Sequence, residues 1–319
     1  MAQSNKKFLE DVFSALRETD AQGLNSNKGQ DILGGLSGLK TVGALQRLAG
    51  LFKSYDDACY LEVGVFQGLS LLSVALDQPN VSCFGIDDFS ILDPEQKNLA
   101  LVKERMEKLN VENAILINEG FEEAFDHLDD YLQGRKIGVY FYDGAHDYRS
   151  QIMGLAFVQA YLHENCVLIV DDANYEFVRQ SSVDFLKSFP SYKLAFEAYS
   201  PAHPANMDKA TLQKHEAGWL NGINILVSDP DNLLPVMLPA VNPDKSLYVN
   251  DWLVHRHPLA HQAAEALDRL CDDSLSDGLG KSSGIENKSD AGGKTGTLFY
   301  NRNTFSEGLP ESRFNAFKN

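Results

Sequence analysis

Five acidic residues stand where apolar, strand-like runs of the sequence end, and they are the main candidates for chemistry: Glu62, Asp87, Asp143, Asp171 and Asp172. In a doubly wound sheet the carboxyl ends of the strands converge on one crevice, where ligands bind. Five carboxylates gathered there would repel one another unless a cation lay among them. Asp143, Asp171 and Asp172 offer hard oxygen ligands suited to Mg²⁺. The alternative is that each aspartate only caps the next helix.

The stretch LEVGVFQGLS, residues 61–70, indicates a strand end, a glycine turn and the start of a helix. Glycine at positions 64 and 68 lets a ligand come close to the backbone, because a Cβ there would fill the space. The free N–H groups of a new helix favour a negatively charged group. Glu62 could accept hydrogen bonds from an amine or a sugar. The alternative is that the glycines serve packing alone.

The elements around these residues alternate between apolar runs and helical patterns. Strands are predicted at 58–61, 81–86, 114–117, 137–142, 166–170, 192–199 and 222–228. Strands that are apolar throughout and separated by helices form a mostly parallel sheet covered on both faces. The predicted fold class is therefore α/β, with a doubly wound sheet of seven strands. One of its helices is expected to begin at Asp93 and Pro94, with Gln96 closing a capping box.

Five regions are expected along the chain. Residues 1–55 hold N-terminal helices, one over about 6–17, and a glycine-rich stretch, 22–38, that is either a flap over the site or a linker. Residues 56–230 form the main domain, 231–271 a helical extension, 272–295 a flexible linker and 296–319 an aromatic tail. The tail docks on its own domain or on a second subunit, so the terminal segments are candidates for homo-oligomer contacts. An insertion at 201–221, with His203, His215 and Trp219, is the candidate for substrate selection or a plain surface loop.

Composition excludes several classes of partner. The net charge of -17 repels nucleic acid phosphates and anionic membranes. Four cysteines without a CxxC pair indicate reduced core thiols in a cytoplasmic protein, and no stretch is apolar enough for export or a membrane span. His255, His257 and His261 could suggest zinc, but only the last two share a helical face, so a zinc site is not favoured.

The run LEVGVFQGLSLLSVAL resembles motif I of class I S-adenosylmethionine-dependent methyltransferases, and specifically of the metal-dependent O-methyltransferases. The run YFYDGAHDYRSQIMGLAFVQAYLHENCVLIVDD is similar to the D-G-x-H-x-Y and D-D segment of the small-molecule branch, which includes macrolide sugar O-methyltransferases. The resemblance covers about residues 41–228. The chain departs from it in lacking a glycine pair before the fifth strand, and in Asp172 where the catechol branch has asparagine.

The resemblance implies a role for each candidate. It places the methionine part of S-adenosylmethionine on Glu62, Gly64, Gly68 and Ser70, the ribose hydroxyls on Asp87, and the adenine beside Gly120 and Phe121. Asp143, Asp171 and Asp172 match the family's metal ligands for Mg²⁺ or another divalent cation. His146 falls where related enzymes place a catalytic lysine.

These residues predict metal-assisted O-methylation of a small hydroxylated acceptor, of sugar or phenol type. A hydroxyl bound to Mg²⁺ loses its proton more easily, and a neutral His146 could take that proton, with Asp143 beside it. One rival is an NAD(P)-dependent oxidoreductase, but Phe66 stands where the middle glycine of G-x-G-x-x-G would be. The other rival is a catalytically silent binding module with the same Rossmann-like fold.

Overall fold

The computed structural model describes residues 4–93, 95–248, 306 and 308–318. The chain divides into two compact units, residues 1–242 with 300–319, and residues 243–299. The first unit contains the sheet and every residue of the candidate site. In the second, the described part is 243–248, with the short 3₁₀ helix Lys245–Tyr248. The expected helix near Leu270, the three histidines at 255, 257 and 261, and the linker 272–295 lie outside the described residues.

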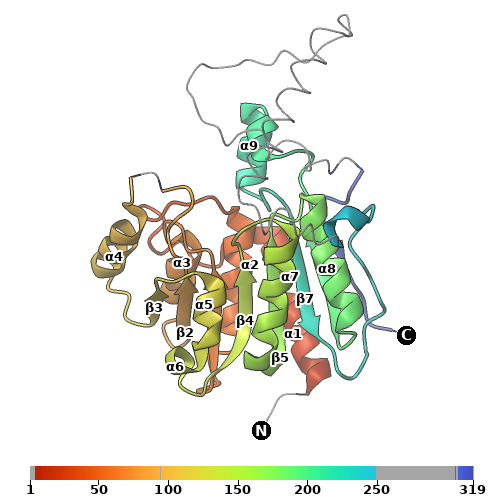
Figure 1. Ribbon diagram of the computed structural model, residues 1–319, viewed down its shortest axis with the longest axis horizontal. Helices are drawn as coiled ribbons and strands as arrows, with labels where there is room; N and C mark the ends of the chain where they lie inside the picture. The colour runs from red at the N-terminus through yellow and green to blue at the C-terminus, as the bar shows by residue number, and fades with distance from the viewer. Residues whose placement is uncertain (1–3, 94, 249–305, 307, 319) are drawn as a thin grey trace, which may run out of the picture. The chain divides into compact units, whose positions relative to one another are not determined.

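Among the described residues, eight strands form one sheet in the order β3-β2-β1-β4-β5-β7-β6-β8 (Figure 1). The strands are β1 Ala58–Val63, β2 Ser82–Ile86, β3 Ala114–Ile117, β4 Lys136–Tyr142, β5 Leu162–Asp171, β6 Tyr192–Ala198, β7 Ile223–Ser228 and β8 Arg313–Phe314. The helices are α1 Asn5–Gln22, α2 Leu39–Gly50, α3 Leu69–Asp77, α4 Asn98–Leu109, α5 Phe121–Asp126, α6 Leu128–Leu132, α7 Tyr148–Phe157, α8 Glu176–Ser188 and α9 Lys209–Glu216. The predicted α/β fold with a doubly wound, mostly parallel sheet is confirmed, with one strand more than expected.

The strand order reverses between β1 and β4. From β1 the chain builds β2 and β3 on one side, then crosses to place β4 and β5 on the other, and these pairs are all parallel. The crevice outside the carboxyl ends of the strands at such a reversal is where open α/β sheets bind ligands. β7 is antiparallel to both β5 and β6. The start of β7 therefore lies beside the carboxyl end of β5.

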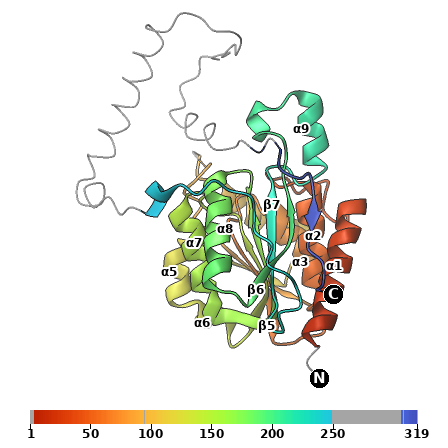
Figure 2. The same cartoon turned by 90° about the vertical axis from the view of Figure 1, so that its right-hand side faces the viewer.

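The two faces of the sheet are covered by different helices, as Figure 2 shows. Side chains alternate along the central strands: Tyr60 and Val139 pack in the cluster formed with α1, α2 and α3. Leu61 and Tyr140 point the other way and pack in the cluster formed with α5 to α8. Because both faces are buried, the strands carry apolar residues at consecutive positions instead of alternating with polar ones.

The helix expected to begin at Pro94 begins instead at Asn98, so the predicted capping box at Gln96 is wrong. Gln96 has a φ of 52°, outside the helical range. The Asp93 carboxylate accepts hydrogen bonds from the backbone N–H groups of Lys97 and Asn98 at 2.9 and 2.8 Å. Asp93 thus caps the helix from farther away than the expected spacing.

The eighth strand comes from the aromatic tail, whose described part docks on its own domain. β8 pairs antiparallel with the edge strand β6. Phe314 packs on Phe196 with ring centroids 4.7 Å apart, and Phe317 packs on Phe13 at 5.7 Å. The tail closes an edge that would otherwise present unpaired backbone groups.

Three cysteines confirm the expectation of reduced core thiols. Cys59, Cys83 and Cys166 are free and buried within strands, and burial is the main cause that raises the pKa of each thiol. Cys271 lies outside the described residues. No helix in the described parts of the chain is long and apolar enough to cross a membrane.

Candidate active site at the carboxyl ends of the central strands

The glycine turn after β1 lies against the end of β4. Gly64 has a φ of 94°, and a Cβ added there would lie 2.0 Å from the carbonyl oxygen of Asp143. Gly68, with a φ of 82°, begins α3 and carries no side chain to cap it. A Cβ at Gly68 would meet Leu72 and Val102 at 3.2 Å. Gly64 therefore permits a close approach of two loops, whereas Gly68 leaves the first turn of α3 without a side-chain cap.

Glu62 is fully buried at the end of β1 and its two carboxylate oxygens have partners within the protein. Tyr60 Oη donates to Oε2 at 2.5 Å, and Ser70 Oγ donates to Oε1 at 3.0 Å. Burial raises the pKa of Glu62 to about 8, against the lowering effect of these two hydroxyls. Glu62 and Ser70, both expected at the cofactor, are thus bonded to each other beneath the glycine turn.

Asp87, at the end of β2, holds the same turn from the other side. Its Oδ2 accepts from the backbone N–H groups of Val65 and Phe66 at 2.8 and 2.7 Å, and its Oδ1 accepts from Phe89 N–H at 2.7 Å. Asp87 is half-buried, while the neighbouring Asp88 is exposed and bonds to Ser90. The structure therefore places Asp87 beside the glycine turn, as expected for a residue that lines a cofactor crevice.

Gly120 and Phe121 lie at the start of α5, past the end of β3. Gly120 precedes the first turn, and a Cβ there would have only the Glu123 carboxylate within 4 Å, at 3.7 Å. The Phe121 ring packs edge-on against Tyr142, with centroids 5.9 Å apart. These two residues stand at the carboxyl edge of the sheet two strands away from the glycine turn.

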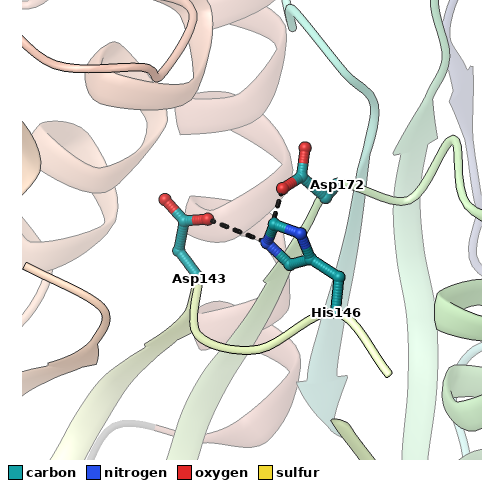
Figure 3. Close-up of side chains that lie close together, drawn as sticks. All are labelled: Asp143, His146 and Asp172. Carbon is teal, nitrogen blue, oxygen red and sulfur yellow. Dashed lines mark ion pairs between the residues drawn. The ribbon is translucent and has the colours of Figure 1, made fainter. Parts of the chain in front are cut away.

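Asp143, His146 and Asp172 form a compact cluster where β4 and β5 end (Figure 3). Asp143 follows β4, Asp172 follows β5, and His146 lies on the loop before α7 and points between them. His146 Nε2 lies 2.6 Å from Asp172 Oδ2 and 3.8 Å from Asp143 Oδ1. One ligand atom from each residue lies within 4.8 Å of the others. The sequence analysis expected Asp143, Asp171 and Asp172 as ligands with His146 beside them, and three of these four residues form the cluster.

The charges in this cluster are strongly coupled. Burial raises the pKa of Asp143 to about 6, although His146 opposes the shift. Burial alone would lower the pKa of His146 and raise that of Asp172. Their mutual attraction reverses both shifts, so that the pKa of His146 is well above its ordinary value and that of Asp172 is below it. The two carboxylates therefore favour the protonated form of His146, whereas the sequence analysis expected a neutral ring.

Asp171 is not part of the compact cluster. It is the last residue of β5, pairs with Ile223 of β7 and is 7% exposed. Burial, followed by the negative charges of Asp143 and Asp172, raises the pKa of Asp171 well above its ordinary value. Asp171 therefore interacts electrostatically with both carboxylates, although it is not one of the three residues whose ligand atoms converge.

Of the residues of the 201–221 insertion, His203 borders the site and the other two candidates are structural. The His203 ring lies 5.9 Å from that of Tyr175, and burial, partly opposed by Asp172, lowers its pKa. Trp219 donates to Asp20 and packs on Phe196. His215 is 8% exposed, within α9.

Sequence reasoning missed two residues of the site, Tyr175 and Asn221. The Tyr175 ring stacks on His146 with centroids 5.6 Å apart and an interplanar angle of 24°. Asn221 Nδ2 donates a hydrogen bond to Asp172 Oδ1. Tyr175 follows the Asp-Asp pair by three residues, so its aromatic type could have drawn attention, but Asn221 is 49 residues from Asp172 and carried no signal.

The donor set of the cluster fits a hard divalent cation. Carboxylate oxygens of Asp143 and Asp172 are the ligands that Mg²⁺ prefers, and an imidazole is acceptable to Mn²⁺ and other transition metals. Burial is the main cause that raises the pKa values of Asp143 and Asp171, and the charges of neighbouring carboxylates add to both shifts. A cation would relieve that repulsion.

Comparisons with known proteins give one family match and a set of similar solved structures. Residues 61–173 match a family model described as a methyltransferase domain. No curated protein matches the chain. Solved structures similar to it include the O-methyltransferase TomG from Streptomyces achromogenes in complex with SAM, at 13% identity, covering 72% of this chain and 100% of that one, with a TM-score of 0.43.

Two further structures have comparable values. The O-methyltransferase from Bacillus cereus in complex with SAH is 10% identical, with coverage of 72% and 93% and a TM-score of 0.42. The SAH-bound methyltransferase PaMTH1 from Podospora anserina is 12% identical, with coverage of 68% and 87% and a TM-score of 0.40. The family match spans the segment that holds the glycine turn and the cluster at the ends of β4 and β5, so residues 61–173 are similar to a methyltransferase domain.

Proposed function

We propose that the protein transfers a methyl group from S-adenosylmethionine to a hydroxyl of a small metabolite, of sugar or phenol type, with the help of a divalent cation. The observation that carries this proposal is the position of Asp143, His146 and Asp172, which converge at the ends of β4 and β5 beside the glycine turn that follows β1. A proton-handling cluster thus lies next to a helix start suited to an anionic ligand.

The cofactor would lie over the glycine turn. The uncapped first turn of α3, after Gly68, offers backbone N–H groups to the carboxylate of a methionine moiety. Asp87 and the Gly120–Phe121 pair border the crevice where ribose and adenine would lie. Glu62 and Ser70 support the turn from below. S-adenosylmethionine, when bound, supplies an electrophilic methyl group on a sulfonium.

A divalent cation would be held by Asp143 and Asp172, with Asp171 as a third carboxyl group next to Asp172 in the sequence. The three carboxylates come from two adjacent strands, so the sheet fixes their separation before any ligand binds. When bound, such a cation supplies positive charge that makes an acceptor hydroxyl more acidic.

His146 holds the proton that must leave the acceptor. Its Nε2 faces both Asp172 Oδ2 and Asp143 Oδ1, so a proton on that nitrogen is stabilised from two sides. The stacked Tyr175 ring fixes the plane of the imidazole. Deprotonated at Nε2, His146 can accept the hydroxyl proton while the acceptor oxygen forms its bond to the methyl carbon, and the methyl–sulfur bond breaks.

Calorimetry and a transfer assay together test this function. The full chain should bind S-adenosylmethionine and S-adenosylhomocysteine, and should methylate members of a panel of catechols and hydroxylated sugars. Transfer should stop in EDTA and return with Mg²⁺ or Mn²⁺. Binding of NADH with none of S-adenosylmethionine would overturn the methyltransferase proposal, and full transfer in EDTA would overturn the metal-assisted part of it alone.

A further inference from the structure

Asn221 is held in front of the cluster by the backbone of β5 and β7. Register between these strands pairs Asp171 with Ile223, so the residues before β7 lie beside those that follow β5. The carbonyl oxygen of Asn221 accepts from Asn174 N–H at 2.9 Å, and that of Gly222 accepts from Ala173 N–H at 3.2 Å. The Asn221 side chain therefore starts from a fixed position next to Asp172.

Only one of the two polar atoms of the Asn221 side-chain amide has a hydrogen-bond partner among the described residues. The residue is 5% exposed, and its Nδ2 donates to Asp172 Oδ1. Its Oδ1 is buried and has no hydrogen-bond partner among the described residues. A buried amide oxygen without a partner is unfavourable, so this atom calls for a positively charged or hydrogen-donating ligand.

The surroundings favour a cation as that ligand. Asn221 contacts Asp172, and the carboxylate oxygens of Asp172 and Asp143 lie within 4.8 Å of each other, an arrangement that attracts a cation and repels an anion. An amide oxygen is a hard ligand that carries no charge, so it adds a ligand without adding a fourth carboxylate to the repulsion. The terminal torsion of asparagine is broad and roughly two-fold, so a half-turn exchanges Nδ2 and Oδ1 with no movement of the backbone.

We propose that Asn221 Oδ1 is a neutral oxygen ligand of the divalent cation at the Asp143–Asp172 cluster. This inference rests on the metal-assisted part of the proposed function. Without a cation, Asn221 Nδ2 faces Asp172, as in this structure. With a cation bound, a half-turn of the amide would bring Oδ1 to the position that Nδ2 now occupies. The ligand comes from the start of β7, outside the strand ends that supply the carboxylates.

Substitutions at Asn221 and at a matched asparagine test the inference by metal binding, independently of activity. Asn224, also on β7, has a fully buried amide that donates to Tyr199 Oη at 3.0 Å and an Oδ1 without a partner among the described residues. Calorimetric titration of the full chain with MnCl₂ should show a loss of affinity of at least about tenfold in Asn221→Ala, while Asn224→Ala should stay within about twofold of the parent. Thermal unfolding followed by circular dichroism verifies that each variant is folded.

Cysteine at the same positions gives a direct signal of contact. Cd²⁺ prefers thiolate ligands, so Asn221→Cys should gain Cd²⁺ affinity and a thiolate-to-metal charge-transfer absorption in the ultraviolet. The parent, whose described cysteines are buried in the core, and Asn224→Cys should show no such band. Parental Mn²⁺ affinity in Asn221→Ala, together with no band in Asn221→Cys, would overturn the proposal. A parent that transfers methyl groups without binding Mn²⁺ would overturn it too, while leaving the methyltransferase function in place.

Discussion

Replacing the buried glutamate of the glycine turn, Glu62→Gln, should make the protein less sensitive to alkaline pH. Glu62 is fully buried, and its pKa is raised by burial from an ordinary value of 4.5 to about 8. Between these two values the folded state holds a proton on Glu62 that the unfolded state has released. The free energy of unfolding therefore falls as pH rises, by at most about 1.4 kcal/mol per pH unit for this one group.

The expected magnitude follows from that shift. Between about pH 5.5 and about pH 8.5 the free energy of unfolding of the parent should fall by on the order of 3 kcal/mol, because unfolding releases the proton held by Glu62. Most of this fall occurs below about pH 8. Glutamine keeps the shape and never ionises. Its amide must find an acceptor where Glu62 now accepts from Tyr60 and Ser70, and rearranging those hydroxyls costs about 1 kcal/mol. The variant should thus be about 1 kcal/mol less stable than the parent near pH 5.5 and roughly 2 kcal/mol more stable near pH 8.5.

Urea unfolding at both pH values, followed by circular dichroism without cofactor, measures the difference. Glu10→Gln, at an exposed position of α1, is the control and should follow the parent at both pH values. If Glu62→Gln is destabilised by the same amount at both, Glu62 is ionised throughout the range. The hydroxyls of Tyr60 and Ser70 would then outweigh the burial cost, and the reasoning from desolvation would be refuted.

Three further variants test other parts of the site and its support. Gly64→Ala should lose several kcal/mol of stability, measured by chemical denaturation, because its Cβ would lie 2.0 Å from the carbonyl oxygen of Asp143. The control Gly134→Ala has a similar φ of 84° but open space around the added Cβ, and should lose only about 1–2 kcal/mol. Equal losses in the two variants would show that the loops at Gly64 and Asp143 separate freely. His146→Ala should bind S-adenosylmethionine like the parent but transfer methyl groups about 100- to 10,000-fold more slowly, with partial recovery as pH rises, and a rate within a few-fold of the parent would assign His146 a structural role. Arg313→Ala leaves the fully buried Glu197 without its ion-pair partner and should lower the free energy of unfolding by about 1–3 kcal/mol, measured by thermal or urea unfolding. The loss should be smaller than for a wholly buried pair because Arg313 is 43% exposed. Arg313→Lys should recover part of the loss, and an unchanged stability in Arg313→Ala would mean that Glu197 is neutral in the folded state.

The sheet could be predicted from the sequence because β1, β2, β4 and β5 are apolar runs that end at or just before an acidic or glycine residue. β3, predicted at 114–117, is found at those residues, and β2 and β4 differ from prediction by one residue at their starts. The proximity of Asp143 and Asp172 was expected from the ends of adjacent parallel strands, whereas His146 was expected there from the family resemblance. Local pattern and global topology agree at these positions.

The features that escaped prediction depend on contacts distant in the sequence. β8 is two residues long and pairs with β6 across more than a hundred residues, so no local pattern marks it. Asn221 reaches Asp172 through the antiparallel register of β5 and β7, which the sequence does not reveal. Asp171 ends β5 and Asp172 follows it, and the Asp-Asp pair alone did not show which of the two carboxylates would converge with Asp143 and His146.

The docked tail also explains how an insertion far from the central strands can contribute to the site. β6 ends at Ala198 and β7 begins at Ile223, so the 201–221 insertion that carries His203 and Asn221 hangs between them. Tyr199 N–H donates to the carbonyl oxygen of Pro310 at 3.2 Å, and Ser306 Oγ donates to that of Ser200. These contacts fix Tyr199 and Ser200, which come just before the insertion, and the hydrogen bond from Asn174 N–H fixes Asn221, its last residue. Because both ends are fixed by backbone hydrogen bonds, the insertion can present side chains at the ends of β4 and β5 although it lies on the antiparallel side of the sheet.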